Sequence, residues 1–196
     1  MRLIYLHGFR SSSRSFKARL LQARLAAAGR AECFLSPDLP VEPDRAVELV
    51  LGTLKPAPED TLVGSSLGGC YATWLAERIG CRAVLLNPAV HPARDLASQV
   101  GPQVGYHDGN PLDFKAQYVE QLRTYEVARI TRPARYLLVA AQGDEVLDWK
   151  EMVAAYPGAR HCIVAGSDHG LSDFESHVDL VLSFAGFAPA GETACD

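Results

Sequence analysis

The chain has few cysteines and no paired-cysteine motif. Its 196 residues include five cysteines, and no two of them form a C-x-x-C pair. An odd number of isolated cysteines argues against a disulfide framework and against a zinc ribbon. The six histidines are dispersed, and no H-E-x-x-H or H-x-x-E-H pattern occurs. We therefore expect neither a metal site nor a cofactor.

Long apolar runs and basic stripes are also missing. No apolar stretch approaches the roughly 20 residues that are needed to cross a bilayer, so we expect no membrane span. Residues 1–6 lead directly into His7 and Gly8, which leaves no room for a signal peptide, and we expect a cytoplasmic protein. The formal net charge is −4, without the run of Lys or Arg that a phosphate backbone requires. Nucleic acid is therefore not an expected partner.

What the chain does contain is the balance of one globular domain. Hydrophobic residues make up 48% and charged residues 21%, which is typical of a chain that folds around its own core. The length suits one domain rather than two. We assign this domain to residues 1–186. Residues 187–196, which include Pro189 and Gly191, are expected to form a flexible C-terminal tail.

Short apolar runs alternate with longer amphipathic stretches, a pattern that predicts βα units on a mostly parallel sheet. The runs are apolar enough to be covered on both faces, so we predict a compact α/β fold with about six strands flanked by helices. The predicted helices cover 15–28, 44–54, 67–79 and about 174–184. The predicted strands are 3–6, 33–35, 61–64, 83–86, 136–140 and 162–165.

One segment interrupts this rhythm after the fourth strand. Residues 87–132 are rich in Pro and Gly before a helical stretch near 114–125. Long connections in compact domains are usually functional or mobile. We therefore interpret 87–132 as a short lid-like insertion or pocket wall within the single domain.

The strongest local motif is Gly64-Ser65-Ser66-Leu67-Gly68, a G-x-S-x-G sequence between a predicted strand and a predicted helix. A tight strand-to-helix turn would hold the Ser66 hydroxyl out of the sheet edge, because small residues on both sides let strand and helix approach. Ser66 is therefore the candidate nucleophile. One alternative is a glycine-rich turn that only packs closely. The other is a phosphate-binding loop, against which the absence of G-K-[ST] and G-x-G-x-x-G argues.

A serine hydroxyl needs a general base, and on such a sheet the partners follow the serine in the order acid, then histidine. His169 comes after the last predicted strand, where its loop can reach Ser66. Asp144 is the first carboxylate after the fifth strand and is the candidate that orients His169. Glu145 and Asp148 are its rivals, and their alternative roles are those of solvated or helix-capping charges.

Acyl chemistry also needs an oxyanion hole and a substrate pocket. We expect the backbone N–H groups of Phe9 and Leu67 to form the oxyanion hole, with Phe9 in the loop after the first strand. His7, Tyr106 and Phe114 are assigned to the substrate-binding region, His7 chiefly by holding this loop. The alternative for Tyr106 and Phe114 is that they only fill the core beneath the insertion.

Several blocks carry a wider resemblance: YLHGF at 5–9, VGSSLGG at 63–69, YATWL at 71–75, NPAV at 87–90 and GDEVLD at 143–148. In this order they resemble the YqiA-like esterases of the α/β-hydrolase superfamily, over almost the whole chain. The resemblance implies a cofactor-free esterase with Ser66, Asp144 and His169 as its triad. The chain departs from the family after the histidine, where the sequence is GLSDFE instead of an aromatic residue and a glycine.

The main functional hypothesis is a serine esterase that hydrolyses small acyl esters or thioesters through an acyl-enzyme. Acyl transfer and dedicated thioester hydrolysis are rival functions of the same triad, because an acyl-enzyme does not dictate its acceptor. A non-catalytic ligand-binding protein on the same scaffold is the rival from another class, and the intact set of site residues argues against it. Because one short insertion cannot enclose a long tunnel, we expect small or linear acyl groups.

Overall fold

The computed structural model describes residues 1–106 and 109–187 of the chain. His107, one of the histidines in the insertion, lies outside the described residues. The predicted tail lies outside them as well, except for its first residue. That residue, Phe187, is buried, and the Arg30 guanidinium lies 5.7 Å from the centre of its ring. Residue 187 therefore belongs to the packed domain.

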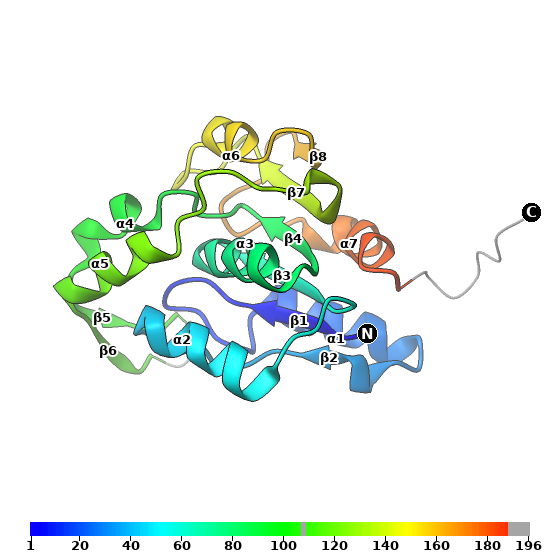
Figure 1. Cartoon of the computed structure of the whole chain (residues 1–196), viewed down its shortest axis with the longest axis horizontal. Coiled ribbons are helices and arrows are strands. Elements are labelled where there is room, and N and C mark those ends of the chain that lie inside the picture. The colour runs from blue at the N-terminus through cyan, green and yellow to red at the C-terminus, as the bar shows by residue number, and fades with distance from the viewer. Residues whose placement is uncertain (107–108, 188–196) are drawn as a thin grey trace, which may run out of the picture.

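The centre of the molecule is a six-stranded sheet in the order β2-β1-β3-β4-β7-β8, in which every pair of neighbours is parallel (Figure 1). The predicted α/β fold with six strands is confirmed, and the observed strands begin and end within two residues of the predicted ones. They are β1 Leu3–Leu6, β2 Phe34–Leu35, β3 Thr61–Ser65, β4 Arg82–Leu86, β7 Tyr136–Ala141 and β8 Arg160–Val164.

Alternation along the inner strands explains why both faces of the sheet are covered. In β1, Ile4 and Leu6 point to one face, and Leu3 and Tyr5 point to the other. The first face packs on helices α2 Pro43–Leu49, α3 Leu67–Ile79, α5 Ala116–Thr124 and α6 Trp149–Ala155. The second packs on α1 Phe16–Ala27 and α7 Val178–Phe184. One hydrophobic core therefore lies on each face of the sheet, and the two cores together hold the strands in place.

The predicted helices are found, with differences at their ends that have local causes. The predicted helix 44–54 is divided into α2 and a π-helical turn, Val50–Leu54, which ends at Lys55 in the left-handed region. The predicted helix 174–184 begins with a 3-10 turn, Phe174–His177, before α7. Helix α6 was not predicted, although Asp148 caps its first turn by accepting from the Lys150 N–H.

The insertion is more ordered than its composition suggested. It contains the short helix α4 Pro92–Asp95, a 3-10 turn Ala97–Gln99, the antiparallel strands β5 Gly101–Val104 and β6 Pro111–Phe114, and then α5. Phe114 therefore ends a strand instead of starting the helix. Arg10, in the loop after β1, joins the hairpin to the sheet: its Nε donates to the Val104 carbonyl at 2.6 Å, and its own carbonyl accepts from the Tyr106 N–H. The hairpin thus lies beside the loop after β1.

No helix among the described residues is long and apolar enough to cross a membrane.

Candidate active site

Ser66 stands between β3 and α3 in a backbone conformation that few residues adopt. Its φ is 54° and its ψ is −120°, which costs on the order of 1–3 kcal/mol for a residue with a side chain. The flanking glycines permit this turn, because a Cβ on Gly64 would lie 2.2 Å from the Gly68 carbonyl oxygen, and one on Gly68 would lie 2.1 Å from that of Leu6. The G-x-S-x-G spacing is therefore a steric requirement of this turn.

His169 brings the three predicted triad positions together. Its Nε2 lies 3.0 Å from Ser66 Oγ, and its Nδ1 lies 2.8 Å from Asp144 Oδ2. With the carboxylate as acceptor, Nδ1 carries the proton, so Nε2 is free to accept from the serine hydroxyl. The three residues follow β3, β7 and β8, whose carboxyl ends share one edge of the parallel sheet.

Asp144 is held in one orientation by the chain that follows it. Its side chain is fully buried, and its Oδ1 accepts from the Val146 and Leu147 N–H groups at 2.8 Å each. This leaves Oδ2 facing His169.

The two rival carboxylates contact other groups. Glu145 accepts from the backbone N–H of His169 at 3.0 Å, and Asp148 accepts from Lys150 N–H at the start of α6. Of the three carboxylates, only Asp144 contacts the imidazole.

The loop after β1 touches the serine turn from the other side. A Cβ on Gly8 would lie 3.0 Å from Ser66 Cβ, so backbone and nucleophile are in close contact there. Phe9 comes next in this loop, and Leu67 is the first residue of α3, where helix N–H groups lack partners within the helix. The positions of both residues fit the predicted oxyanion donors, and helix α3 adds the positive end of its dipole.

His7 ties this loop to the segment after β2. Its Nε2 accepts from the Leu39 N–H at 2.9 Å, so Nδ1 carries the proton and donates to the Gly8 carbonyl at 2.9 Å. The residue is 6% exposed. These bonds match the loop-holding role expected for His7, and the ring also forms part of a cavity wall.

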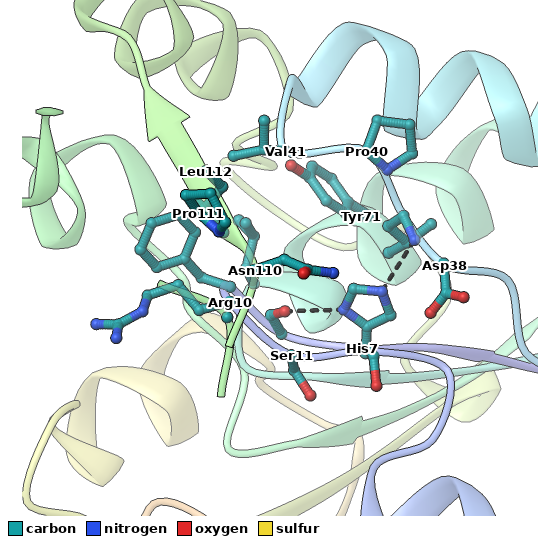
Figure 2. Close-up of a pocket in the computed structure, with 16 residues that line it drawn as sticks. His7, Arg10, Ser11, Asp38, Pro40, Val41, Tyr71, Asn110, Pro111 and Leu112 are labelled. Carbon is teal, nitrogen blue, oxygen red and sulfur yellow. Dashed lines mark hydrogen bonds between the residues drawn. The ribbon is translucent and has the colours of Figure 1, made fainter. Parts of the chain in front are cut away.

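A cavity of about 290 Å³ lies on the side of the loop after β1 (Figure 2). Its lining includes Gly8, which is in close contact with Ser66, and Leu67, which follows Ser66 in the chain. Its walls come from the loop after β1, the segment after β2, two residues of α3 and the insertion hairpin. Its lining combines apolar side chains with several polar or charged ones, among them His7, Asp38 and Asn110. The lining residues are His7, Gly8, Phe9, Arg10, Ser11, Ser12, Asp38, Leu39, Pro40, Val41, Leu67, Tyr71, Gly105, Asn110, Pro111 and Leu112.

Two residues assigned to substrate binding lie elsewhere. Tyr106 is 69% exposed, and the Arg10 guanidinium stacks over its ring at 4.3 Å. Phe114 is completely buried between Phe9, at a ring distance of 5.0 Å, and Tyr118, at 5.8 Å. Neither lines the cavity: Tyr106 lies on the surface, and Phe114 supports Phe9 from the core. The insertion reaches the cavity through Leu112 and its neighbours instead.

Two buried residues beside the site were not predicted from the sequence. Asn87, the first residue after β4, is fully buried and hydrogen-bonded to the loop that carries His169. Lys17 in α1 is 6% exposed, and its Nζ donates to the Gly170 carbonyl. Burial lowers the pKa of Lys17 to about 8, against the opposing attraction of Asp168 and Asp144. The sequence signal for Asn87 is an asparagine directly after a buried strand. The sequence signal for Lys17 is a single lysine on an otherwise apolar helix face.

No group of three or more His, Cys, Asp or Glu that could hold a metal ion occurs in the described part of the chain.

Comparison with solved structures defines the class of protein. The chain has the fold of the α/β hydrolases. A protein from Agrobacterium vitis S4 superposes with a TM-score of 0.75 at 21% identity, over 94% of this chain and 87% of that one. The alpha/beta hydrolase domain-containing protein 10 from mouse superposes with a TM-score of 0.68 at 15% identity, over 92% of this chain and 89% of that one. The esterase domain of a Rhodothermus marinus protein superposes with a TM-score of 0.64 at 20% identity, over 94% of this chain and 85% of that one.

The family follows from the sequence. The UPF0227 family, described as an uncharacterised protein family, matches residues 2–186, and the chain belongs to it. A UPF0227 protein of Vibrio vulnificus (strain CMCP6) is 25% identical in an alignment of 158 positions, and the alignment covers 74% of this chain and 77% of the relative. UPF0227 is the YqiA family, so the resemblance to the YqiA-like family is confirmed.

Proposed function

We propose that this protein is a serine esterase that cleaves small acyl esters or thioesters. The observation that carries the proposal is the continuous hydrogen-bonded series from Asp144 through His169 to Ser66, beside a cavity large enough for a small acyl group. Serine, histidine and aspartate in this arrangement activate a hydroxyl for attack on a carbonyl carbon. The esterase domain from Rhodothermus marinus, with which this chain shares its fold, adds support by analogy.

The geometry gives each residue a step. Ser66 Oγ attacks the carbonyl carbon while His169 Nε2 takes the hydroxyl proton, and Asp144 stabilises the imidazolium that forms. The negative charge that develops on the carbonyl oxygen is stabilised by the Phe9 and Leu67 N–H groups and the start of α3. His169 then returns the proton to the leaving alcohol or thiol. Water, activated by the same imidazole, releases the acid from the acyl-enzyme.

The cavity sets the size of the acyl group. Its volume of about 290 Å³ lies at the lower end of the range for small-molecule sites. Leu39, Val41 and Leu112 give it apolar walls, and each CH₂ that they bury contributes roughly 0.8 kcal/mol. We therefore expect kcat/KM to rise with acyl chain length until the cavity is full, after which longer chains bring no further gain.

The test is a panel of p-nitrophenyl esters and coenzyme A thioesters of graded chain length, from acetyl to lauroyl. Ser66→Ala is expected to lose turnover by a factor on the order of 10⁶. Ser65→Ala is the matched control: Ser65 is the neighbouring, buried serine, and its replacement should leave kcat close to that of the wild type. Equal losses in both variants, or hydrolysis that survives in Ser66→Ala, would contradict the proposal.

A further inference from the structure

The loop that carries His169 is held by side chains from distant parts of the chain. Three successive carbonyl groups accept hydrogen bonds from buried donors. Asn87 Nδ2 donates to the Asp168 carbonyl at 2.9 Å and to that of His169 at 3.1 Å, and Lys17 Nζ donates to that of Gly170. These contacts span more than 80 residues in sequence for Asn87, so they can form only in the folded domain.

The loop needs such support because its backbone is strained. Ser167 has a φ of 60° and Leu171 a φ of 48°, both in the left-handed region that residues with a side chain rarely adopt. His169 lies midway between them. A loop with strain on both sides of the imidazole keeps one conformation only where surrounding contacts determine it.

Asn87 joins this loop to the strand that leads to Asp144. Its Oδ1 accepts from the N–H of Ala141, the last residue of β7, at 2.8 Å. Its amide therefore donates toward the general base and accepts from the strand that leads to the acid, and both its nitrogen and its oxygen are satisfied. The side chain has no exposed surface, so water does not compete for these bonds.

The backbone of Asn87 indicates that its side chain is used. Its φ is 43°, a conformation that glycine adopts with the least strain and that Asn tolerates better than most residues. Glycine would satisfy the backbone at this position but would supply no amide. An asparagine here combines the required φ with the hydrogen bonds.

We propose that Asn87 is a positioning residue, whose amide holds the His169 loop against the end of β7 so that the imidazole lies between Ser66 and Asp144. This inference rests on the proposed serine esterase function for its effect on rate. Displacement of a reacting group by about 1 Å can cost on the order of 10²-fold in rate. Loss of the Asn87 amide is therefore expected to reduce kcat, and to leave substrate binding in the cavity, which Asn87 does not line, almost unchanged.

Asn87→Asp is the most informative variant. Aspartate has the same shape, tolerates the same φ, and keeps an oxygen for the Ala141 N–H. It replaces the two donated hydrogen bonds with a carboxylate that faces two carbonyl oxygens. We expect kcat to fall on the order of 10²-fold, with KM for a short-chain ester changed by less than about threefold.

Tyr136→Phe is the matched control for a general loss of stability. Tyr136 lies at the other end of β7, is 1% exposed, and its hydroxyl donates to Glu77, so the variant also removes a buried hydrogen bond. It should lower the melting temperature and leave kcat within about twofold of the wild type. If Asn87→Asp keeps wild-type kcat, or if its loss only follows the unfolded fraction as Tyr136→Phe does, the inference is overturned.

A second readout separates this inference from the proposed function. The proton on His169 Nδ1, hydrogen-bonded to the buried Asp144 carboxylate, should give a far-downfield NMR signal in the wild type. We expect Asn87→Asp to shift or remove it, and Tyr136→Phe to leave it in place. This result would uphold the positioning role even if the wild type hydrolysed no ester. An unchanged signal in Asn87→Asp, in an active enzyme, would refute the positioning role alone.

Discussion

Three carboxylates within five residues show how the roles of similar side chains are decided at the residue scale. Asp144, Glu145 and Asp148 all follow β7, and sequence alone gives only their order. The structure distinguishes them by their hydrogen bonds: Asp144 accepts from two N–H groups of its own loop and faces the imidazole, while Asp148 caps a helix. The carboxylate that contacts His169 was predictable because it comes first after the strand, but the contacts of its neighbours depend on α6 and on the His169 loop.

Conservative amides at the three positions test this assignment. Asp144→Asn should reduce kcat on the order of 10⁴-fold, because the amide favours the wrong imidazole tautomer and leaves the imidazolium without a counter-charge. Glu145→Gln keeps an oxygen for the His169 N–H, and Asn is as good a helix cap as Asp at 148, so both should lose less than about tenfold. Steady-state kinetics on one short-chain ester is sufficient. A loss at Asp148→Asn that equals the loss at Asp144→Asn would transfer the role.

Lys17 gives a prediction about stability and pH. Burial lowers its pKa in the folded protein to about 8, from the ordinary value of 10.5 in the unfolded chain. Between these values the unfolded state binds the proton and the folded state does not, so the free energy of unfolding rises with pH. Below pH 8 both states are protonated, and the full cost of the buried charge is present.

Lys17→Met removes this titration and should flatten the rise. A pKa shift of this size corresponds to roughly 3 kcal/mol. Between pH 7 and 10, the free energy of unfolding of the wild type should therefore rise relative to that of Lys17→Met by up to about 3 kcal/mol. Urea unfolding of both proteins at several pH values measures the difference, in which the other titrating groups cancel. If the free energies of unfolding of the two proteins change with pH in parallel, burial does not lower the pKa of Lys17.

At the scale of elements, the regular βα units were predictable and the insertion was not. The inner strands β1, β4 and β7 are largely apolar runs, and α3 follows a G-x-S-x-G motif and is capped by Gly80, so local sequence defines them. The hairpin β5–β6 has no such apolar run: its short strands alternate between half-buried and exposed residues until Phe114. Its position depends on Arg10, whose contacts with Val104 and Tyr106 are about 95 residues distant in sequence and leave no local signal.

The hairpin yields a test that separates the cavity wall from the core. Leu112→Ala enlarges the cavity and should raise kcat/KM for longer acyl chains relative to acetyl, each additional CH₂ that is accommodated being worth roughly 0.8 kcal/mol. Phe114→Ala removes a fully buried ring behind Phe9 and should cost about 3–5 kcal/mol of stability. Because Phe114 does not line the cavity, this variant should affect all chain lengths alike. The opposite pattern would place the acyl group against Phe114.

At the scale of the whole molecule, the site exists because six parallel strands end at one edge. Ser66, Asp144 and His169 are separated by up to 103 residues, yet each follows a strand of the same sheet. This arrangement could be predicted from the order of motifs along the chain, since parallel strands bring their carboxyl ends together. The second set of contacts, from Asn87 and Lys17 to the His169 loop, could not, because it depends on how β4 and α1 pack in three dimensions.

The most direct test of Ser66 as the nucleophile is labelling with a fluorophosphonate, followed by mass spectrometry of the intact chain and of its peptides. An activated serine attacks the phosphorus and releases fluoride, so its hydroxyl oxygen becomes part of a stable phosphonate ester. We expect one adduct per chain, located on Ser66, and no adduct on Ser66→Ala. A wild-type protein that remains unlabelled, or an adduct on Ser65 or another serine, would contradict this assignment.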